Sequence, residues 1–498
     1  MSGDRGPVAI LAGRIFSFPV LLGLLLLLAV LVIARAFNVD ADTWWHLVVG
    51  QGILRTHAWP AADPYSFSAR GVNWMAYEWL ADVLLALADR AFGLRGLMVL
   101  LFAWAGAITL LTYCYACLRC RSPRTAFLAT AMTLPLLGVW FTLHPQLLGY
   151  IFLLITLICR EHSRQGRTRA VWFLPLVFLL WVNTHGTFVF GFLALGIAWL
   201  CGLVEWRSGC LIAERLPPAP RRQLLLAIWA SAMAGCVTPY GPRLLTYPLQ
   251  MMIGQQEITA HMTSWQPIPL SIWHGKLFLA YVLLFVVAVM GLRPAVRLED
   301  FTLFIFAVVM TALHARALPL FAIVFTPLLA DLLKGRVGDA PPARDRPVLN
   351  GLLMAMAVCA LIKLFPTRGE LKECVAARAP VVAVEFLRRH PPPQPMLNEL
   401  VFGGYLLYAP GLQQPVFIDG RLDIYQGAGV LADYLRLPSG AAFTLRKYSI
   451  QSCLLPPSAP LVAVLSASGD WRKVYGDGMS VVYVRKSATE KGPTRGGQ

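Results

Sequence analysis

Long apolar runs, separated by short loops that contain arginine, follow one another along most of this sequence. A helix needs roughly 20 apolar residues to cross a bilayer, and fewer where it borders a cavity. By that rule the chain has about eleven candidate spans, at 15–37, 96–117, 125–143, 147–159, 170–182, 187–206, 222–239, 276–291, 301–313, 318–333 and 348–364. The sequence therefore predicts a polytopic α-helical membrane protein.

The composition agrees with a membrane protein and argues against a nucleic-acid-binding protein. Hydrophobic residues make up 57% of the 498 residues and charged residues only 14%, outside the usual balance of a water-soluble domain. The formal net charge of +17 could indicate a nucleic-acid partner. However, the arginines occur in small groups between apolar runs and form no single basic stripe, so we expect membrane lipids and no nucleic acid as partners.

The basic residues instead predict the topology, because cytoplasmic loops are enriched in arginine and lysine. With a cytoplasmic N-terminus, every inside loop is basic, and the residues concerned are Arg5, Arg14, Arg119, Arg121, Arg124, Arg160, Arg164, Arg167, Arg169, Arg207, Arg215, Arg221, Arg222, Arg293, Arg297, Lys334, Arg336, Arg344 and Arg346. The three short outer turns, near His144, His185 and His314, contain a single arginine, Arg316. We expect the first span to be retained, since its apolar run is too long for a signal peptide. An odd number of spans places the C-terminal region outside.

The first long outer segment, 38–95, is expected to carry two helices that lie flat on the membrane. In 42–54, apolar residues recur at helical spacing, with Trp44 and Trp45 at headgroup depth and Asp42 and His46 on a polar face. The second helix, 74–89, carries Glu78 and Asp82. Residues 1–365, including this loop, form the predicted transmembrane domain.

The second outer segment, 366–486, is predicted to be a small α/β domain, followed by a disordered tail at 487–498. We expect helices at 379–389 and 430–437 and strands in VFGGYLLY, PVFIDG and MSVVYVRK. Asp419 and Arg421 could bind a saccharide or form an internal ion pair, and the ion pair is favoured. Cys374 and Cys453 could form a disulfide in an oxidising compartment.

Polar residues at the outer ends of the spans are the main functional signal. They are His144, Gln146, Asn183, His185, Tyr240, His314 and Arg316. In the predicted topology they share one membrane face with Asp40 and Asp42, and ionisable groups at such depth usually line a water-filled cavity. Each also has an ordinary structural interpretation: an aspartate can cap a helix, and a histidine or arginine at a helix end can reach toward the headgroups.

Several of these segments resemble the GT-C superfamily of membrane glycosyltransferases. The resemblance covers nearly the whole chain, and more closely it is to a bacterial branch with the pattern D-x-D-x-W-W-H. The segments are DADTWWHL, YEWLAD, HPQ, WVNTHG, TPYG, HARALPLF, NELVFGGYLLY and PVFIDGRLDIYQG. The resemblance implies a GT-C-like fold. It also implies an enzyme of the bacterial inner membrane that takes a hexose or pentose from a polyprenyl-phosphate carrier at the outer face.

The resemblance also implies roles for individual residues. Asp40 or Asp42 would be the catalytic carboxylate, acting as general base toward an acceptor hydroxyl or as ligand of a divalent metal. Glu78 is a second candidate base. Asp40, Asp42 and His46 form the candidate metal set, whose oxygen-rich chemistry favours Mg²⁺ or Mn²⁺ over zinc.

Arg316 is the candidate ligand of the lipid phosphate, because a guanidinium offers two parallel donors to it. The remaining candidate substrate-binding residues are His46, His144, Gln146, Asn183, His185, Tyr240 and His314. The sequence lacks the WWD-type signature of oligosaccharyltransferases, so protein N-glycosylation is not expected and the acceptor stays open. Two alternatives from other classes also stay open: a carrier or flippase for a lipid-linked saccharide, and a non-catalytic scaffold in envelope assembly.

Overall fold

The structure is a computed structural model that describes residues 13–37, 39–254, 262–337, 346–412 and 414–486. The predicted tail at 487–498, Asn38 and the loop arginines Arg5 and Arg344 lie outside these ranges. The chain divides into two compact units. The first comprises 1–38, 98–250 and 259–367, and the second comprises 39–97, 251–258 and 368–498.

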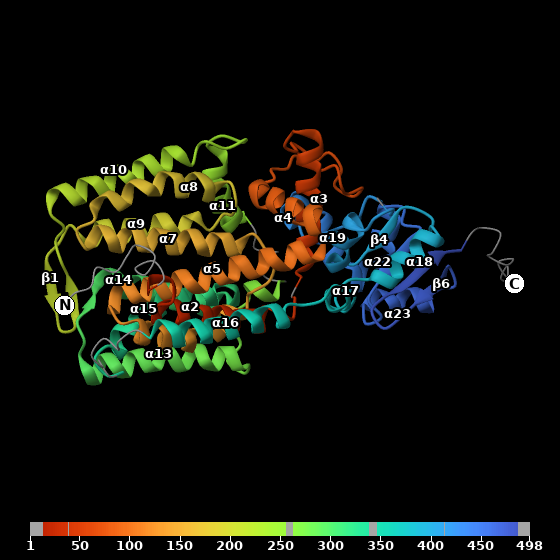
Figure 1. Cartoon of the computed structure of the whole chain (residues 1–498). Coiled ribbons are helices and arrows are strands. Elements are labelled where there is room, and N and C mark those ends of the chain that lie inside the picture. Colours follow the sequence, from red (N-terminus) through yellow and green to blue (C-terminus); the bar gives the residue numbers. More distant parts are fainter. Residues whose placement is uncertain (1–12, 38, 255–261, 338–345, 413, 487–498) are drawn as a thin grey trace, which may run out of the picture. The chain divides into compact units, whose positions relative to one another are not determined.

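The first unit is a bundle of apolar helices, and each predicted span overlaps one of them (Figure 1). They are α2 (Phe18–Ala34), α5 (Leu94–Cys120), α6 (Pro123–Gly138), α7 (Gln146–Arg164), α8 (Leu174–Val182), α9 (Phe188–Cys201), α10 (Pro218–Ala234), α13 (Trp273–Leu292), α14 (Leu298–Leu313), α15 (Leu318–Leu333) and α16 (Pro347–Leu364). A 3₁₀ helix, η1 (Thr168–Phe173), precedes α8, and helix α11 (Arg243–Gly254) was not expected from the sequence. Helices α7 to α10 pack side by side (Figure 1).

Helix α15 is the centre of this bundle. Nearly all of its side chains are buried, and Phe321 and Phe325 pack against aromatic rings of α13 and α14. Its contact with α6 includes a hydrogen bond of 2.6 Å between the hydroxyls of Thr133 and Thr326. Each hydroxyl also lies within hydrogen-bond distance of a carbonyl of its own helix, so the hydroxyl that accepts across the interface can donate to its own carbonyl and both groups are satisfied.

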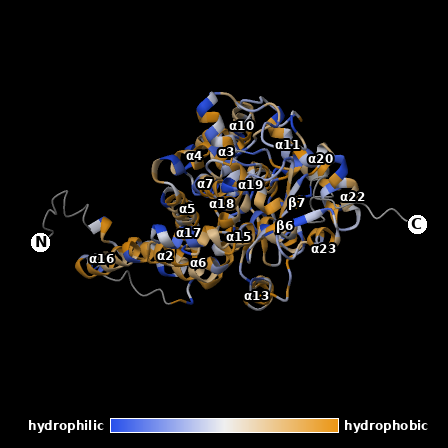
Figure 2. Cartoon of the chain, turned by 90° about the vertical axis from the view of Figure 1, so that its right-hand side faces the viewer, coloured by the Kyte–Doolittle hydropathy of each residue, from blue (hydrophilic) through white to orange (hydrophobic). Residues whose placement is uncertain are grey.

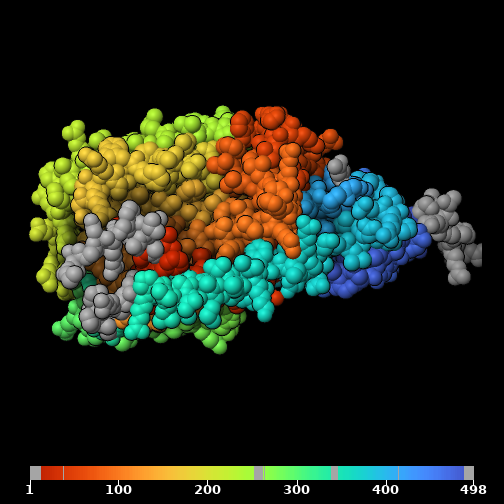
Figure 3. Space-filling model, viewed as in Figure 1, coloured from red at the N-terminus to blue at the C-terminus, as the bar shows by residue number. Residues whose placement is uncertain are grey.

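Other helices of the bundle expose their apolar side chains. Met290 on α13 and Ile362 on α16 are each 73% exposed, both helices are strongly hydrophobic in Figure 2, and the α16 residues lie on the face seen in Figure 3. Within the described residues, four helices are long and apolar enough to cross a membrane, namely Leu94–Cys120, Trp273–Leu292, Ala315–Leu333 and Pro347–Leu364. Exposed apolar surface of this extent is typical of a helix that faces lipid.

One end of the bundle is closed by charged residues and a small sheet. Strands β1 (Trp206–Ser208), β2 (Leu211–Ala213) and β3 (Val296–Arg297) form this sheet, in which β2 is central. Asp300 at the start of α14 accepts from Arg160 of α7 at 3.1 Å and lies 2.8 Å from a guanidinium nitrogen of Arg119 on α5. These ion pairs tie three helices together at the same end.

The second unit combines the first outer segment with the C-terminal region. Helices α3 (Ala41–Thr56) and α4 (Trp79–Phe92) pack on each other, and α3 packs on α19 (Leu400–Tyr408). The four-stranded sheet has the order β4-β5-β7-β6, with β4 (Met396–Asn398), β5 (Ser452–Leu455), β6 (Trp471–Gly476) and β7 (Val481–Arg485). Around it lie α17 (Arg368–Ala376), α18 (Val381–Arg389), α20 (Leu422–Gly427), α21 (Val430–Leu435), α22 (Leu437–Lys447) and α23 (Pro460–Ala467).

Several local predictions for this unit were wrong. VFGGYLLY forms helix α19 and no strand, and PVFIDG contributes only an isolated bridge from Val416 to Ser66. Trp44 and Trp45 do not face the membrane from a surface helix, because they are 3% and 6% exposed and pack inside the protein. The thiols of Cys374 and Cys453 are free, so no disulfide joins them.

Candidate functional site

The acidic pair after the first span lies at the start of α3. Asp40 is the N-cap of this helix, as one reading of the sequence predicted, and its Oδ1 accepts from the backbone N–H of Asp42 at 3.2 Å. Asp42 in the first turn accepts from the indole N–H of Trp45 at 3.1 Å. Both aspartates are partly exposed, so a carboxylate remains accessible to a substrate at this helix end.

The C-terminal region supplies a wall beside Asp42. A β-carbon at Gly420, in the segment FIDGR, would lie 1.6 Å from Asp42 Oδ1 and 2.8 Å from the Trp45 indole nitrogen. Atoms cannot approach so closely, so any larger residue at this position requires the Asp42 side chain or the FIDGR backbone to move. The two segments, almost 380 residues apart in the sequence, therefore form one local structure around the carboxylate.

Helices α3 and α4 enclose His46 between two acidic side chains, Glu78 and Asp82. His46 is fully buried, its Nδ1 lies 2.6 Å from Asp82 Oδ1, and its Nε2 lies 3.6 Å from Glu78 Oε2. Glu78 is 3% and Asp82 1% exposed. Burial lowers the pKa of His46 to about 3, against the nearby charge of Asp40, and burial raises the pKa of Asp82 well above its usual range. A neutral histidine at this position holds α3 and α4 together.

The candidate metal set is not assembled. His46 contacts Asp82 and Glu78, whereas Asp40 and Asp42 are engaged by backbone and indole N–H groups. Within the described parts of the chain, no group of three or more His, Cys, Asp or Glu side chains is arranged to hold a metal ion. Asp40, Asp42 and His46 thus do not fit the Mg²⁺ or Mn²⁺ site that was predicted.

A buried ionic cluster fixes FIDGR against the outer segment. Arg421 donates from Nε and Nη2 to the two carboxylate oxygens of Asp419, at 2.9 and 2.6 Å, and from Nη1 to Asp63 at 2.6 Å. Its guanidinium lies 5.0 Å from the ring centroids of both Tyr65 and Trp74. The predicted ion pair of Asp419 and Arg421 is confirmed, and burial raises the pKa of the Tyr65 hydroxyl to about 12.

Arg316 forms a closed cycle of hydrogen bonds with Gln146 and Tyr150, which lie near the start of α7 in the first unit. Its Nη2 donates to Gln146 Oε1 at 2.9 Å, Gln146 Nε2 donates to the Tyr150 hydroxyl at 2.6 Å, and that hydroxyl donates to the Arg316 carbonyl at 3.2 Å. The guanidinium also lies 4.5 Å from the ring centroid of Trp265, which precedes it on η2 (Thr263–Trp265). Arg316 is partly exposed, so its orientation is fixed while one edge reaches solvent.

Two predicted histidines lie together in the same unit. The rings of His144 and His185 are 6.1 Å apart between centroids. Nδ1 of His144 accepts from the backbone N–H of Gln146, and Nδ1 of His185 accepts from that of Thr187. A ring nitrogen that accepts a hydrogen bond carries no proton, so each neutral imidazole has its proton on Nε2. Both histidines can therefore donate from Nε2.

The other predicted polar residues have structural contacts. Asn183 donates to the carbonyls of Leu179 and Val237, at 2.8 and 3.1 Å. Nδ1 of His314 lies 2.8 Å from the carbonyl oxygen of Trp265. The backbone N–H of Tyr240 donates to the hydroxyl of Thr238. A role for these three in substrate binding stays a prediction.

Sequence reasoning missed several residues that build these sites. Asp82 follows Glu78 by one helical turn, a spacing that could have indicated a shared partner. Tyr150 follows Gln146 at the same spacing on α7. Gly420, Asp63 and Trp265 offered no such signal, because their partners are distant in the sequence.

No family model and no curated protein matches this sequence, but solved structures do. The oligosaccharyltransferase AglB from Archaeoglobus fulgidus, in complex with an inhibitory peptide and a dolichol-phosphate, gives a TM-score of 0.55 at 11% identity, covering 87% of this chain and 69% of that one. The apo form of the oligosaccharyltransferase from the same organism gives 0.53 at 12% identity, with the same coverage. ArnT from Cupriavidus metallidurans, bound to undecaprenyl phosphate, gives 0.48 at 13% identity, covering 95% and 99%.

The likeness to the oligosaccharyltransferase structures defines the class of fold. The chain is a helical protein with several apolar helices and a small C-terminal sheet, and it resembles the membrane folds of GT-C glycosyltransferases. At 11–12% identity this likeness concerns the fold. A shared fold does not define the reaction, which depends on the residues of the site.

Proposed function

We propose that the protein is a glycosyltransferase that acts at the outer face of its membrane and moves a sugar from a polyprenyl-phosphate donor to an acceptor hydroxyl. The observation that carries the proposal is the Asp42 carboxylate, which is partly exposed at the start of α3 and held by the Trp45 indole. Its setting in a GT-C-like fold supports this reading, since AglB was solved with a dolichol-phosphate.

The general base is Asp42 or its neighbour Asp40. Attack on the anomeric carbon requires the acceptor hydroxyl to lose its proton as the new bond forms, and a positioned carboxylate can take that proton. Glu78, the other candidate, is 3% exposed and lies beside His46. It is therefore less accessible to an acceptor than either aspartate, and we assign it a role in positioning α3.

Arg316 is the proposed ligand of the lipid phosphate. Departure of the polyprenyl phosphate leaves charge on its oxygens, and a fixed guanidinium stabilises that charge without having to reorganise. Gln146 and Trp265 hold the guanidinium in place. The Nε2 protons of His144 and His185 add two neutral donors that can reach phosphate or sugar hydroxyls.

The proposal is tested with the full-length protein in native membrane vesicles, which retain the unidentified acceptor and contain polyprenyl-phosphate sugars. Release of polyprenyl phosphate, measured by mass spectrometry, reports transfer even though the acceptor is unidentified. Asp40→Asn and Asp42→Asn are compared with Asp470→Asn, a change in the turn before β6. We expect at least one of the first two variants to lose most of the release and the control to retain it.

The same vesicles separate the alternatives. A flippase moves labelled lipid between leaflets without breaking the sugar–phosphate bond. A scaffold needs residues after 365 for envelope assembly but tolerates both aspartate changes. Undiminished release from folded Asp40→Asn and Asp42→Asn proteins would overturn the catalytic assignment.

A further inference from the structure

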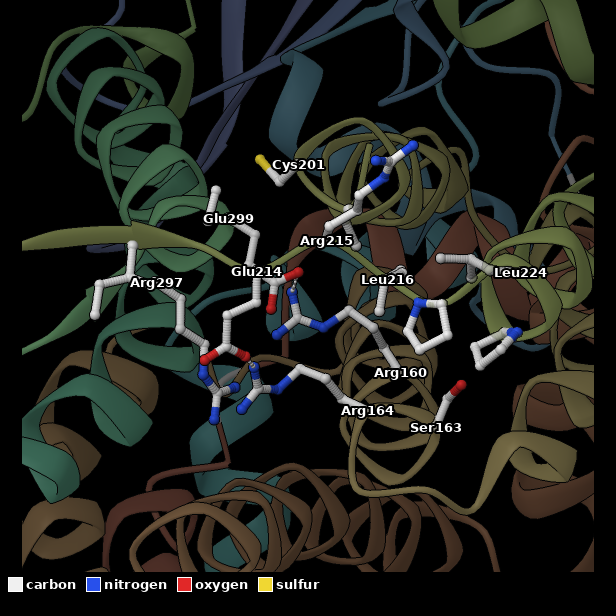
Figure 4. A pocket seen from close by; sticks show the side chains of 16 residues that line it. Arg160, Ser163, Arg164, Cys201, Glu214, Arg215, Leu216, Leu224, Arg297 and Glu299 are labelled. Atoms are coloured by element: carbon white, nitrogen blue, oxygen red, sulfur yellow. Dashed lines mark hydrogen bonds and ion pairs between the residues drawn. The ribbon is translucent and has the colours of Figure 1, made fainter. Parts of the chain in front are cut away.

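The charged end of the helix bundle contains a pocket that the proposed reaction does not use. Its volume is about 220 Å³, and it lies between the ends of α7, α9, α10 and α14 and strand β2. Arg160, Arg164, Arg297, Glu214 and Glu299 line one side (Figure 4). The arginine distribution predicts that this end is cytoplasmic, so the pocket belongs to the opposite face from the proposed donor site.

Arg160 and Glu299, two residues of opposite charge that line the pocket, each have a buried polar atom without a hydrogen-bond partner among the described residues. Arg160 is 4% exposed, and its Nε makes no hydrogen bond to any described residue. The same holds for Oε1 of Glu299, whose side chain is 13% exposed. A buried polar atom without a partner costs about 1–3 kcal/mol, and a ligand toward which these side chains turn slightly supplies the missing partners and removes this cost.

The pocket is lined by charges of both signs. Arg160 lies 3.6 Å from Glu299, and Arg164 lies 3.4 Å from Glu214, with the two arginines extending in the same direction across the pocket (Figure 4). Arg297 is engaged by Glu161 at 2.7 Å. With Arg215, four lining arginines outnumber the two lining glutamates, so the pocket favours an anionic group. A ligand that also carries a cationic group gains in addition from the glutamates.

The opposite side of the pocket is apolar, and Ala198, Leu216 and Leu224 line it. The helices α9 and α10 also carry exposed apolar side chains, among them Leu200 and Leu226, which are 58% and 43% exposed. The volume is below the roughly 300–1,000 Å³ of pockets that enclose a drug-sized molecule. It therefore accommodates a headgroup but not a lipid chain, which would lie against the exposed leucines.

We infer that this pocket binds the headgroup of a phospholipid that carries a phosphodiester and a primary ammonium, as in phosphatidylethanolamine. Arg160 and Arg164 bind the phosphate, and Glu299 binds the ammonium. Basic pockets between helices on the cytoplasmic side are known sites for lipid headgroups. Binding would fix the ends of α7, α9, α10 and α14 relative to one another.

Lipid binding is measured by native mass spectrometry of the full-length protein in detergent, titrated with phosphatidylethanolamine or phosphatidylglycerol. Arg164→Gln is the test variant, because Arg164 is 27% exposed and its loss disturbs the bundle less than loss of buried Arg160. Arg222→Gln, an exposed change on α10 outside the pocket, is the matched control. We expect Arg164→Gln to weaken phosphatidylethanolamine binding at least about tenfold and the control to bind like the wild type.

Glu299→Gln tests the ammonium contact. It should weaken phosphatidylethanolamine binding while leaving phosphatidylglycerol binding unchanged or stronger. Equal binding by the wild type, Arg164→Gln and Arg222→Gln would overturn the site. Tighter binding of phosphatidylglycerol by the wild type would overturn the headgroup assignment. If soluble phosphoethanolamine at equal concentration fully displaces phosphatidylethanolamine, the ligand is the free headgroup compound and the assignment to a membrane lipid is overturned.

Discussion

Gly420 approaches Asp42 so closely that a β-carbon at position 420 would lie 1.6 Å from the Asp42 carboxylate oxygen. The segment FIDGR is thus part of the surroundings of the proposed base, although it belongs to the C-terminal region. A shift of a catalytic group by about 1 Å can cost on the order of 100-fold in rate. The C-terminal region therefore has a direct effect on the candidate active site.

Gly420→Ala should reduce transfer by at least about tenfold, because either Asp42 or the FIDGR backbone must move. Gly427→Ala is the control, since a β-carbon there would meet no described atom within 4 Å. Both proteins are assayed for polyprenyl phosphate release and for thermal unfolding. Full activity of Gly420→Ala would show that the geometry at Asp42 is not critical.

Arg421→Met should destabilise the protein by about 3–5 kcal/mol, because it leaves the buried carboxylates of Asp63 and Asp419 without their counter-charge. The control is Arg389→Met, which removes an exposed pair with Glu385 and should cost less than about 1 kcal/mol. Denaturant unfolding of the full-length variants, followed by tryptophan fluorescence, compares the two. Similar losses for both variants would contradict the proposed role of the cluster.

The apolar spans of the first unit could be predicted from the sequence, whereas α11 and α19 could not. Apolar run length is a local property, and each predicted span overlaps a helix. The valine, phenylalanine and tyrosines of VFGGYLLY favour a strand, although its two glycines do not. The segment is helical because Gly403 and Gly404 allow close packing: β-carbons there would lie 2.1 Å from the Ile418 carbonyl and 2.6 Å from that of Ala41. Tertiary contact of this kind overrides local propensity.

In the candidate site, too, some features could be predicted from the local sequence and others depend on tertiary contacts. The polar residues at helix ends could be found because apolar spans contain so few of them. The direction of each side chain could not, since it depends on partners elsewhere in the chain. His46 was placed on a polar face from its spacing to Asp42, but α4 covers it and Asp82 binds its ring. A histidine in an amphipathic pattern can therefore be solvated or buried with an acid, and the sequence does not distinguish the two.

Buried His46 predicts a pH dependence of stability. Its pKa is about 3 in the folded protein and 6.5 in the unfolded chain, so between these values only the unfolded chain binds the proton. Its contribution to stability is present above pH 6.5 and is lost as the pH falls toward 3, with a slope of at most about 1.4 kcal/mol per pH unit. The raised pKa of Asp82 acts with the opposite sign, because the folded protein binds that proton more tightly.

Comparison with His46→Asn isolates the histidine, since Asp82 is present in both proteins. The difference in the free energy of unfolding between wild type and variant should shrink as the pH is lowered from 6.5 to 4. Denaturant unfolding at several pH values measures it. A difference that is constant over this range would show that His46 is not held neutral by burial.

Arg316→Gln should lower kcat/KM for the polyprenyl-phosphate donor by about 10- to 100-fold, because hydrogen bonds from a charged donor contribute about 1.5–3 kcal/mol. The KM rises because the bound phosphate loses a contact, and kcat falls because the departing phosphate does. Arg316→Lys keeps the charge but loses the planar fork that Gln146 and Trp265 orient, so it should lie between the wild type and Arg316→Gln. The control is Arg243→Gln, an exposed change in the same unit. Release of polyprenyl phosphate at varied donor concentration separates KM from kcat. An unchanged KM in Arg316→Gln, with kcat also unchanged, would remove Arg316 from the donor site and leave His144 and His185 as the remaining candidates for contact with the phosphate.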